Sequence, residues 1–465
     1  MDTSSLKFGT SGLRGLAADL EGQAARRHVT AFLRHLGTEG AGRVYLGRDH
    51  RASSPTIMRD CAIAIAAEGL EPVDCGALPT PALALHAMAT GCPAIMVTGS
   101  HIPADRNGLK FYRPDGEIGK ADEAGILAML SDAAVAARPV RMPDESAAAM
   151  ERYVGRFRGL LPDGALRGRR IGIFEHSTVA RDVLGRVLRH FGAETIGLGR
   201  LEGFVPVDTE AFGDGVFSPL PGWVAQHGLD AIVSADGDGD RPLLMDGTGE
   251  FVRGDVLGLL SARYLGADIV VTPVTSNSAI ERTGLFGQVI RTKVGSPHVV
   301  AELARMTGPA IGFEANGGTL VGRGITVRGE TLAPLETRDA ILPLLCTLGL
   351  AAAAGVALGA LVATLPLQHA LSDRLQDVPG ERSAAFLARL AEDPAYAGAL
   401  FGARGIAAMS RIDGVQIRTS GGDMVHFRAS GNAPELRCYV EGGTEAGARE
   451  LLAWGLGVAA RELGL

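Results

Sequence analysis

The chain has 465 residues, of which 46% are hydrophobic and 21% charged, and 45 basic against 52 acidic side chains leave a formal net charge of −7. This composition is typical of a globular protein with several cores, and it excludes disordered, collagen-like and coiled-coil chains. A mildly acidic chain without a basic stripe also argues against nucleic acid as the main partner. Small-molecule chemistry is therefore favoured.

The cysteines and the first residues indicate a reducing compartment. The five cysteines are odd in number, widely scattered and without a CxxC pair, which argues against a disulfide framework and against a thiolate metal site. The opening residues, MDTSSLKFGTSGLRG, contain no apolar core flanked by basic residues, so no secretory signal is expected. We therefore expect a cytoplasmic protein.

Apolar runs of strand length recur along the chain, and each is followed by a Gly-rich polar loop and then by a pattern that we interpret as helical. This order predicts an α/β fold with parallel sheets. Residues 94–100, 231–238 and 310–317 resemble one another, since each is a short apolar run that ends in small polar residues. Ligands collect beyond the carboxyl ends of strands in open α/β sheets, so we expect the three loops to converge on one cleft.

Shifts in composition predict four domains. They occur around residues 134–150, 246–255 and 366–379. The resulting domains are 1–148, 149–250, 251–366 and 367–465. The last of these has the pattern of a hairpin, a further strand over 436–441 and a closing amphipathic helix from about Glu445 to Glu462, which indicates α+β structure.

The loop at 98–110 reads TGSHIPADRNGLK and follows the apolar run PAIMV. We interpret Gly99 as the residue that permits a tight backbone there, so that Ser100 is presented beyond a strand end with His101 beside it and Lys110 farther on. This arrangement suits a nucleophile or a phosphate carrier near a base and a cation. Only four of the 45 basic residues are lysines, which points to Lys110 and Lys293 for roles that need a compact amine.

The loop at 236–241 reads DGDGDR and spaces Asp236, Asp238 and Asp240 two residues apart. In an extended backbone such side chains point the same way, so three acids would meet at one spot. Their repulsion calls for a hard cation, and oxygen-only ligands indicate Mg²⁺ or Ca²⁺ rather than zinc. Arg241 and Gly247 stand where an EF-hand needs Gly and Glu, which excludes a calcium-sensor loop. Arg241 can meet phosphate oxygens beside the metal.

Two later loops carry groups that suit a phosphorylated sugar. FEANGG at 313–318 offers the carboxylate of Glu314 and the amide of Asn316 for sugar hydroxyls. RASGNAPELR at 428–437 offers donors of the kind that bind a phosphate monoester. These donors are Arg428, Ser430, the backbone of Gly431, and Asn432.

A stretch without charged residues lies between Asp339 and His369 and is long enough to span a bilayer, which takes about 20 residues. It is dominated by Ala and Gly, contains Pro343 and Pro366, lacks aromatic anchors and divides around Gly355. We therefore expect two buried helices rather than a membrane span. The sequence does not indicate any further role for this stretch.

In this order the motifs resemble those of the α-D-phosphohexomutase family, over nearly the whole chain. The matching segments are KFGTSGLRG at 7–15, TGSHIPADRNGLK at 98–110, DGDGDR at 236–241, FEANGG at 313–318 and RASGNAPELRCYVE at 428–441. They are similar to the family's N-terminal signature, phosphoserine loop, magnesium loop, sugar-specificity loop and phosphate-binding loop.

The resemblance implies three related α/β domains with mixed sheets and a smaller α+β C-terminal domain, around a central cleft. It implies Mg²⁺ as cofactor, bound by Ser100, Asp236, Asp238 and Asp240. It implies catalytic roles for Ser100, His101, Lys110 and Arg241, with Ser100 as phosphoryl carrier and Lys110 as proton shuttle. The implied substrate-binding residues are Arg14, Lys293, Glu314, Asn316, Arg428, Ser430, Gly431, Asn432 and Arg437.

This chain departs from the family pattern at four places. Gly99 stands where Ala is common, and Ile102 stands where the family often has Asn. We expect the chemistry to survive both changes. Asn432 replaces the usual Thr of the phosphate loop and keeps a hydrogen-bond donor. The sugar loop has Ala315 and Asn316 where a Glu, any residue, Ser pattern is usual, so sugar identity is the least constrained property.

The expected reaction is reversible transfer of a phosphoryl group between the 6- and 1-positions of a hexose phosphate, through phosphoserine and a bound hexose 1,6-bisphosphate. The EANGG form of the sugar loop looks most like a subgroup usually assigned to mannose phosphates. A glucose-phosphate or dual-specificity mutase is the nearest alternative, followed by a sugar-bisphosphate phosphatase and a non-catalytic sugar-phosphate sensor. We expect a small-molecule partner, neither nucleic acid nor membrane, and a monomer or homodimer; the sequence sets neither oligomeric state nor resting phosphorylation of Ser100.

Overall fold

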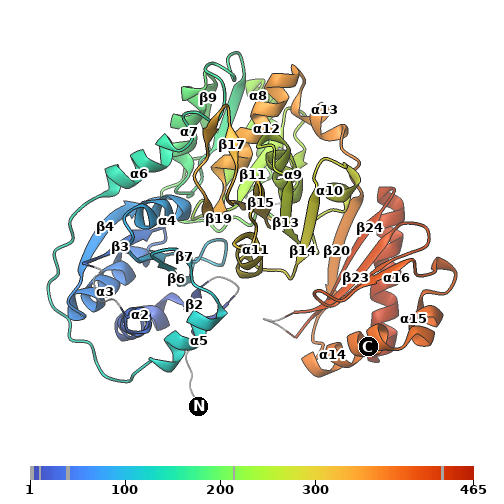
Figure 1. Ribbon diagram of the computed structural model, residues 1–465, viewed down its shortest axis with the longest axis horizontal. Coiled ribbons are helices and arrows are strands. Elements are labelled where there is room, and N and C mark those ends of the chain that lie inside the picture. Colours follow the sequence, from blue (N-terminus) through green and yellow to red (C-terminus); the bar gives the residue numbers. More distant parts are fainter. Residues whose placement is uncertain (1–4, 10–11, 38–41, 213–214, 431–433) are drawn as a thin grey trace. The chain divides into compact units, whose positions relative to one another are not determined.

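The computed structural model describes residues 5–9, 12–37, 42–212, 215–430 and 434–465. The protein is a mixed α/β chain (Figure 1). The described residues form three larger sheets that mix parallel and antiparallel strands, one two-stranded sheet, and an antiparallel sheet near the C-terminus. It forms two compact units, one of Met1–Val271 with Gly295–Thr364 and the other of Thr272–Val294 with Leu365–Leu465. The finer division into four domains stays a prediction.

The first sheet has the strand order β1-β2-β6-β5-β3-β4, and β7 pairs with β6. Its strands are β1 Lys7–Phe8, β2 Leu13–Leu16, β3 Arg43–Arg48, β4 Glu71–Ala77, β5 Ala94–Val97, β6 Arg106–Arg113 and β7 Gly116–Glu117. Its helices are α1 Ala17–Leu20, α2 Gln23–Leu36, α3 Ser54–Ala67, α4 Thr80–Ala89 and α5 Lys120–Ala128. Helix α2 buries Ala25, Val29, Phe32 and Leu33, the spacing of one helical face, in the core beside the sheet.

The second sheet has the order β12-β11-β10-β8-β9. Its strands are β8 Arg170–Phe174, β9 Glu194–Leu198, β10 Ala231–Ala235, β11 Pro242–Asp246 and β12 Phe251–Val252. Helices α7 Arg181–His190 and α8 Leu220–His227 pack against it, whereas α6 Ser146–Gly155 packs against α4 and β4 of the first sheet and against α7. β8 is parallel to β9 and β10, whereas β10 and β11 are antiparallel and place Ala235 opposite Pro242. The DGDGDR loop is therefore the turn of a hairpin.

The third sheet has the order β14-β13-β15-β16-β19, and β17 pairs with β18. The strands are β13 Ile269–Pro273, β14 Gln288–Thr292, β15 Ala310–Phe313, β16 Thr319–Val321, β17 Thr326–Val327, β18 Glu330–Thr331 and β19 Leu335–Asp339. The helices are α9 Gly254–Tyr264, α10 Ala279–Arg282, α11 Ser296–Leu303, α12 Ile341–Ala354 and α13 Leu358–Ala363. The FEANGG loop connects antiparallel β15 and β16.

The three similar apolar runs are buried strands, as predicted. The element that follows each polar loop, however, is a strand and not a helix. β5, β10 and β15 are each followed by an antiparallel neighbour, namely β6, β11 and β16. The interpretation as helices was wrong because runs such as LKFYR and PLLMD are short, and periodicity does not distinguish a strand from a helix over so few residues.

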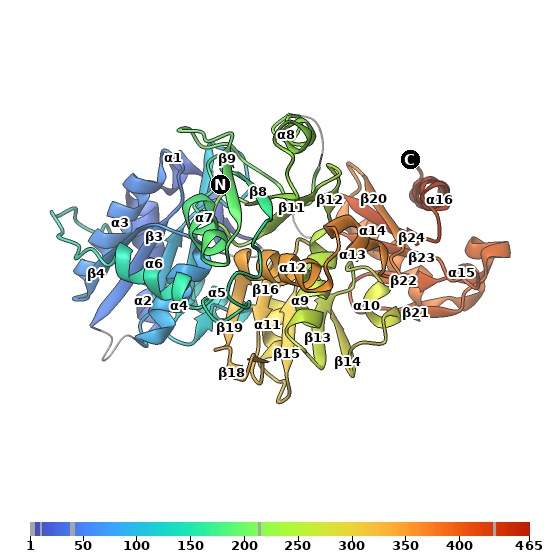
Figure 2. The same cartoon turned by 90° about the horizontal axis from the view of Figure 1, so that it is seen from above.

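The uncharged stretch forms the two expected helices, α12 and α13. α12 ends at Gly355, whose φ of +67° is left-handed, and it packs against α9 (Figure 2). In the part of the chain that the structure describes, no helix is long and apolar enough to cross a membrane. The two helices also line a cavity of about 570 Å³ together with residues of the second sheet.

The second unit contains an antiparallel sheet with the order β20-β24-β23-β22-β21. Its strands are β20 His369–Leu375, β21 Ala408–Ser410, β22 Val415–Arg418, β23 Met424–Ala429 and β24 Leu436–Gly442. Its helices are α14 Gly380–Glu392, α15 Pro394–Phe401 and α16 Glu445–Leu463, with a 3₁₀ turn at Gly402–Arg404. The predicted hairpin, third strand and closing helix are thus present, and the Thr444 hydroxyl caps α16 by accepting from Gly447 N at 3.1 Å.

Candidate active site

Ser100 lies buried in the loop between β5 and β6, directly after the strand end. Its φ is +52°, a left-handed conformation that non-glycine residues adopt uncommonly and that is often found at functional sites. Its N–H donates to Thr98 Oγ1 at 2.8 Å, and its Oγ donates to Asp236 Oδ2 at 2.5 Å and lies 3.3 Å from His101 Nδ1. The side chains of Ser100 and His101, which the sequence placed beside each other, are thus in contact in the structure.

Gly99 has a different role from the one that the sequence suggested. The positive φ belongs to Ser100, whereas a Cβ on Gly99 would lie 2.7–2.9 Å from guanidinium atoms of Arg51. The glycine is therefore required by a close approach of a side chain and not by a turn of its own backbone.

Arg51 is fully buried and holds the Ser100 loop in shape. Its Nη1 donates to the carbonyls of Pro103 at 2.6 Å and Arg106 at 2.9 Å, and its Nη2 donates to those of Ser100 at 2.9 Å and Ile102 at 2.6 Å. The Phe204 ring covers the guanidinium at 4.0 Å. Sequence reasoning missed Arg51, because no local pattern marks an arginine whose partners lie about fifty positions away.

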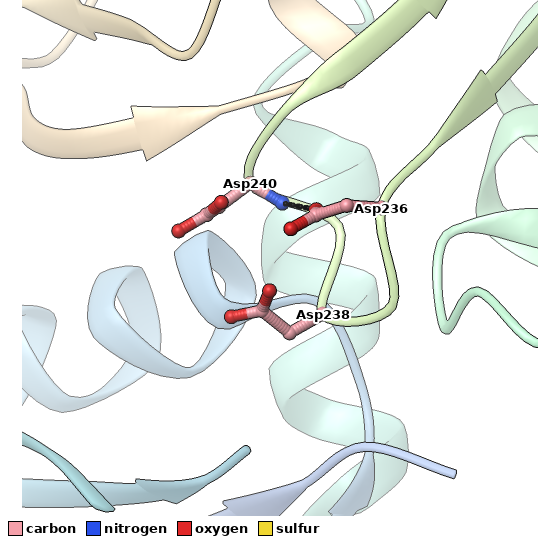
Figure 3. Close-up of side chains that lie close together, drawn as sticks. All are labelled: Asp236, Asp238 and Asp240. Carbon is pink, nitrogen blue, oxygen red and sulfur yellow. Dashed lines mark hydrogen bonds between the residues drawn. The ribbon is translucent and has the colours of Figure 1, made fainter. Parts of the chain in front are cut away.

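The three aspartates meet on the hairpin turn after β10, and their carboxylates point to the same side of it (Figure 3). The turn is closed around Asp236, whose Oδ1 accepts from Asp240 N at 3.1 Å and Arg241 N at 3.2 Å. Gly239 supplies a left-handed φ of +71°. The acids were predicted to converge, but the extended backbone given as the reason was wrong, since a tight turn brings them together.

Two carboxylate oxygens of the three aspartates accept no hydrogen bond from the described residues. Asp238 Oδ2 accepts from Lys110 Nζ and from Thr80 Oγ1, each at 2.6 Å. Asp240 Oδ2 accepts from Lys110 Nζ at 2.6 Å and from Arg338 Nη2 at 2.7 Å. The Oδ1 atoms of both aspartates are buried and have no hydrogen-bond partner among the described residues.

This donor set fits Mg²⁺. One ligand atom from each aspartate lies within 4.8 Å of the others, all three residues are buried, and Ser100 Oγ is in contact with Asp236. Carboxylate and hydroxyl oxygens are the ligands that hard divalent cations prefer. Buried carboxylate oxygens without a donor are costly, and a cation at this position would remove that cost.

The charges within the cluster are unequal. Burial, Asp238 and Asp240 raise the pKa of Asp236 well above its usual range. Burial would also raise the pKa of Asp240, but Arg338 and Lys110 outweigh it and hold that pKa well below the usual range. The pKa of Lys110 is raised, because Asp238 and Asp240 outweigh its burial, so this side chain is an ammonium at neutral pH.

Cationic side chains gather beside the aspartates. Arg14 on β2 is predicted to bind substrate, and burial together with Arg241 and Arg338 lowers its pKa to about 10. Arg241 is buried and lies 3.9 Å from Asp240 and 3.5 Å from Glu210. Burial and the neighbouring Arg241 and Arg14 lower the pKa of His101 to about 2, so its imidazole is neutral. The neighbourhood of Ser100 therefore suits an anion.

The predicted sugar loop lies in the same unit. Its turn is closed by Glu314 N, which donates to Gly318 O at 3.2 Å, and by Gly318 N, which donates to Asn316 Oδ1 at 3.0 Å. Glu314 Oε2 accepts from Arg338 Nη1 at 2.6 Å. Arg338 thus contacts both Glu314 and Asp240, and the sequence reasoning missed it. Its position at the end of β19, directly before the uncharged stretch, was the available signal.

The remaining predicted residues lie in the second unit. Arg437 on β24 stands opposite Arg428 on β23 and opposite Arg374 on β20, so one sheet face carries a row of three arginines. Asp413 Oδ2 accepts from Arg428 Nε at 2.7 Å and from Val294 N, next to Lys293, at 3.0 Å.

The phosphate loop is described only in part. Ser430 N donates to Glu435 O at 2.9 Å, whereas Gly431 and Asn432 lie outside the described residues. Sequence reasoning missed Arg374 and Asp413. Arg374 could have been found by the in-register pairing of β20 with β24, but Asp413 had no local signal.

Two family models match parts of the chain. Residues 5–135 match the one described as phosphoglucomutase/phosphomannomutase, alpha/beta/alpha domain I, and residues 253–368 match alpha/beta/alpha domain III of the same family. A phosphomannomutase of Sinorhizobium fredii is 46% identical, with 97% of this chain and 98% of that protein covered. A phosphomannomutase of Salmonella muenchen is 40% identical, with 95% and 93% covered.

Solved structures share the fold. A phosphoglucomutase/phosphomannomutase family protein from Burkholderia thailandensis superposes with a TM-score of 0.79 at 20% identity, covering 98% of this chain and 97% of that one. A putative phosphomannomutase from Thermus thermophilus gives 0.76 at 23% identity, covering 99% and 100%.

Proposed function

Because the chain belongs to the phosphoglucomutase/phosphomannomutase family, we propose that it transfers a phosphoryl group reversibly between the 6- and 1-positions of a hexose phosphate, with mannose phosphate as preferred substrate. One observation carries the proposal. Ser100, in a strained conformation, contacts Asp236 within a buried cluster of three aspartates, Lys110 and several arginines. Relatives named phosphomannomutase at 46% and 40% identity support mannose phosphate.

In the proposed reaction Ser100 carries the phosphoryl group. The bond between its Oγ and phosphorus breaks while the free hydroxyl of the sugar forms a new bond to phosphorus, which gives a bound hexose 1,6-bisphosphate. The bisphosphate turns over, its other phosphate returns to Ser100, and the isomerised monophosphate leaves. Transition states of this kind are loose, so positioning and charge stabilisation supply most of the catalysis.

The charged side chains divide the electrostatic work. Ser100, Asp236, Asp238 and Asp240 would hold Mg²⁺, which supplies charge neutralisation on the transferring phosphoryl group when bound. Lys110, an ammonium held by two of the aspartates, gives a proton to Ser100 Oγ as its bond to phosphorus breaks, and takes up the proton that the attacking sugar hydroxyl releases. Arg241 stabilises the transferring charge, and the neutral His101 orients Ser100.

Substrate recognition is assigned to two groups of residues. Arg14, Glu314 and Asn316 are proposed to bind the sugar and the reacting phosphate, and the phosphate that is not transferred would be bound by the second unit. The residues assigned to that phosphate are Lys293, Arg428, Ser430, Gly431, Asn432 and Arg437. We also propose the four domains 1–148, 149–250, 251–366 and 367–465 and a cytoplasmic location, which the five free cysteines support.

The test is a mutase assay on mannose 1-phosphate, glucose 1-phosphate and glucosamine 1-phosphate, with Mg²⁺ and a trace of the matching 1,6-bisphosphate. We expect mannose 1-phosphate to be converted fastest and Ser100→Ala to abolish conversion of every sugar, because the phosphoryl carrier is lost. Release of inorganic phosphate without isomerisation would identify a phosphatase instead. Faster conversion of glucose 1-phosphate would overturn the assignment of the sugar.

A further inference from the structure

Arg338 is a buried arginine that spans two loops of the candidate site. It is among the largest fully buried side chains among the described residues. Its Nε and Nη2 donate to Asp240 Oδ2 at 3.1 and 2.7 Å, and its Nη1 donates to Glu314 Oε2 at 2.6 Å. One planar guanidinium therefore bridges a carboxylate of the metal loop and a carboxylate of the sugar loop.

The sugar loop is built to make room for this arginine. A Cβ on Gly318, the last residue of FEANGG, would lie 2.6 Å from Arg338 Cδ, 2.9 Å from Arg338 Cγ and 2.9 Å from the carbonyl oxygen of Asp240. The second glycine of the motif is therefore required by the stem of Arg338. This close approach does not depend on the hydrogen bonds, and it again brings together Gly318 of the sugar loop, Asp240 of the aspartate turn and Arg338.

The bridge fixes which oxygen of each carboxylate is used. Asp240 Oδ2 accepts from Lys110 and from two nitrogens of Arg338, whereas its Oδ1 has no hydrogen-bond partner among the described residues. Arg338 likewise donates to only one oxygen of Glu314, Oε2. A carboxylate oriented before its ligand arrives loses less rotational freedom on binding.

We propose that Arg338 is a positioning residue that orients Asp240 toward the metal and Glu314 toward the sugar, so that metal binding and sugar selection depend on the same side chain. The inference rests on the proposed function, since it deepens the account of that site. Lysine cannot replace arginine here, because its compact ammonium cannot reproduce a planar fork that reaches two carboxylates.

The experiment compares Arg338→Lys, which keeps the charge, with the wild-type protein. Mg²⁺ binding to the protein without sugar is measured by isothermal titration calorimetry, and kcat/KM is measured for mannose 1-phosphate and glucose 1-phosphate. We expect Mg²⁺ to bind about tenfold more weakly, the usual effect of losing a partner of a metal ligand. We also expect the ratio of the two kcat/KM values to move toward one by about the same factor.

The matched control is Arg156→Lys. Arg156 is a partly buried arginine of the same unit that donates to Ala333 O at 2.6 Å, and within the described residues it makes no hydrogen bond to the aspartate turn or to the FEANGG loop. We expect its Mg²⁺ affinity and sugar ratio to equal those of the wild type. A purely structural role for Arg338 would lower the amount of folded enzyme without changing either quantity, so circular dichroism is recorded for all variants.

Gly318→Ala provides a second variant if Arg338→Lys does not fold. It displaces the Arg338 stem without changing any charge, and it should weaken Mg²⁺ binding in the same direction. Wild-type affinity and sugar ratio in the folded variants would overturn the inference. If the wild-type protein converted no hexose phosphate, the proposed function would fail, while the calorimetric comparison would still decide whether Arg338 orients Asp240.

Discussion

At the scale of single residues, the conformation of Ser100 depends on a side chain that the motif does not contain. Ser100 has a φ of +52°, and Arg51 donates to the carbonyls of Ser100, Ile102, Pro103 and Arg106 around it. A strained residue persists only where its surroundings hold it. The loop thus presents Ser100 to Asp236 because a buried guanidinium replaces the hydrogen bonds that a regular strand would provide.

We predict that Gly99→Ala destabilises the protein and lowers kcat. The new Cβ would lie 2.7–2.9 Å from Arg51, and overpacking of this kind costs about 1–3 kcal/mol. Urea denaturation gives the free energy of unfolding, and the mutase assay gives kcat. Gly443→Ala is the control, because a Cβ at Gly443 meets nothing within 4 Å. Equal stability of the two variants would contradict the assigned role of Gly99.

The raised pKa of Asp236 predicts how stability depends on pH without metal. Above the ordinary pKa of an aspartate, the unfolded chain has lost a proton that folded Asp236 still holds, so stability falls as pH rises. Asp236→Asn removes this titration. In EDTA, we expect the variant's melting temperature to exceed that of the wild type by an amount that grows between about pH 5 and about pH 8.

Mg²⁺ should reverse this order. It stabilises the wild-type protein by binding only the folded state, and it should leave Asp236→Asn nearly unchanged. The melting temperatures of both proteins are measured across this pH range with and without Mg²⁺. An equal increase on adding Mg²⁺ for the wild type and for Asp236→Asn would exclude Asp236 from the metal site.

At the scale of elements, three hairpins present the chemistry of the first unit. The Ser100 loop, the aspartate turn and the FEANGG loop each follow a buried strand and lead into an antiparallel neighbour. Because each loop joins two strands that are hydrogen-bonded to each other, both of its ends are fixed by the sheet. A buried arginine donates hydrogen bonds to each loop. Arg51 contacts the Ser100 loop, and Arg338 contacts both the aspartate turn and the FEANGG loop.

The uncharged segment offers a prediction about helix ends. Gly355 ends α12 with a φ of +67°, and Gly355→Ala should destabilise the protein by about 1–2 kcal/mol, the cost of a left-handed residue with a side chain. Gly457 lies inside α16 in open space, so Gly457→Ala should be neutral or stabilise by up to about 1 kcal/mol. Denaturation of the two variants tests the opposite signs. A change of the same sign in the free energy of unfolding for both variants would contradict the left-handed conformation assigned to Gly355 after α12.

At the scale of the whole molecule, the residues to which we assign roles in the reaction are divided between the two compact units. The first unit holds Ser100, the aspartates, Lys110 and Arg338, and the second holds Arg428, Arg437 and Lys293. The second unit is discontinuous in sequence, and Asp413 joins its parts by accepting from Val294 N and from Arg428 Nε. The residues proposed to transfer the phosphoryl group and those proposed to bind the distal phosphate should therefore affect different kinetic constants.

We predict that Arg428→Ala raises KM about 10- to 100-fold for every sugar with a smaller change in kcat, because a charge-assisted contact to phosphate is lost in the ground state and in the transition state alike. Ser100→Ala should instead remove kcat. Arg449→Ala is the control in the same unit, since Arg449 is exposed on α16 and pairs with Glu445. Steady-state kinetics separate the constants, and an unchanged KM would exclude Arg428 from the site.

The sequence alone determined the features that depend on neighbouring residues. The strands before the three loops, the grouping of Asp236, Asp238 and Asp240, the two helices over 341–354 and 358–363, and the α+β end of the chain all follow from short-range patterns. Local spacing and apolar runs carry this information because side-chain direction repeats with the backbone. The family motifs added the chemistry of Ser100 to this list.

Only the tertiary structure decided which distant charges meet. Arg338 lies 98 positions from Asp240, and Arg51 lies 49 from Ser100. No short-range pattern pairs them, because their approach depends on how sheets and hairpins are ordered in space. A buried charge is tolerated only beside its partner, so such pairs depend on the complete fold and not on one element. The motifs therefore indicate what reacts, and the tertiary contacts decide how the reacting groups are held.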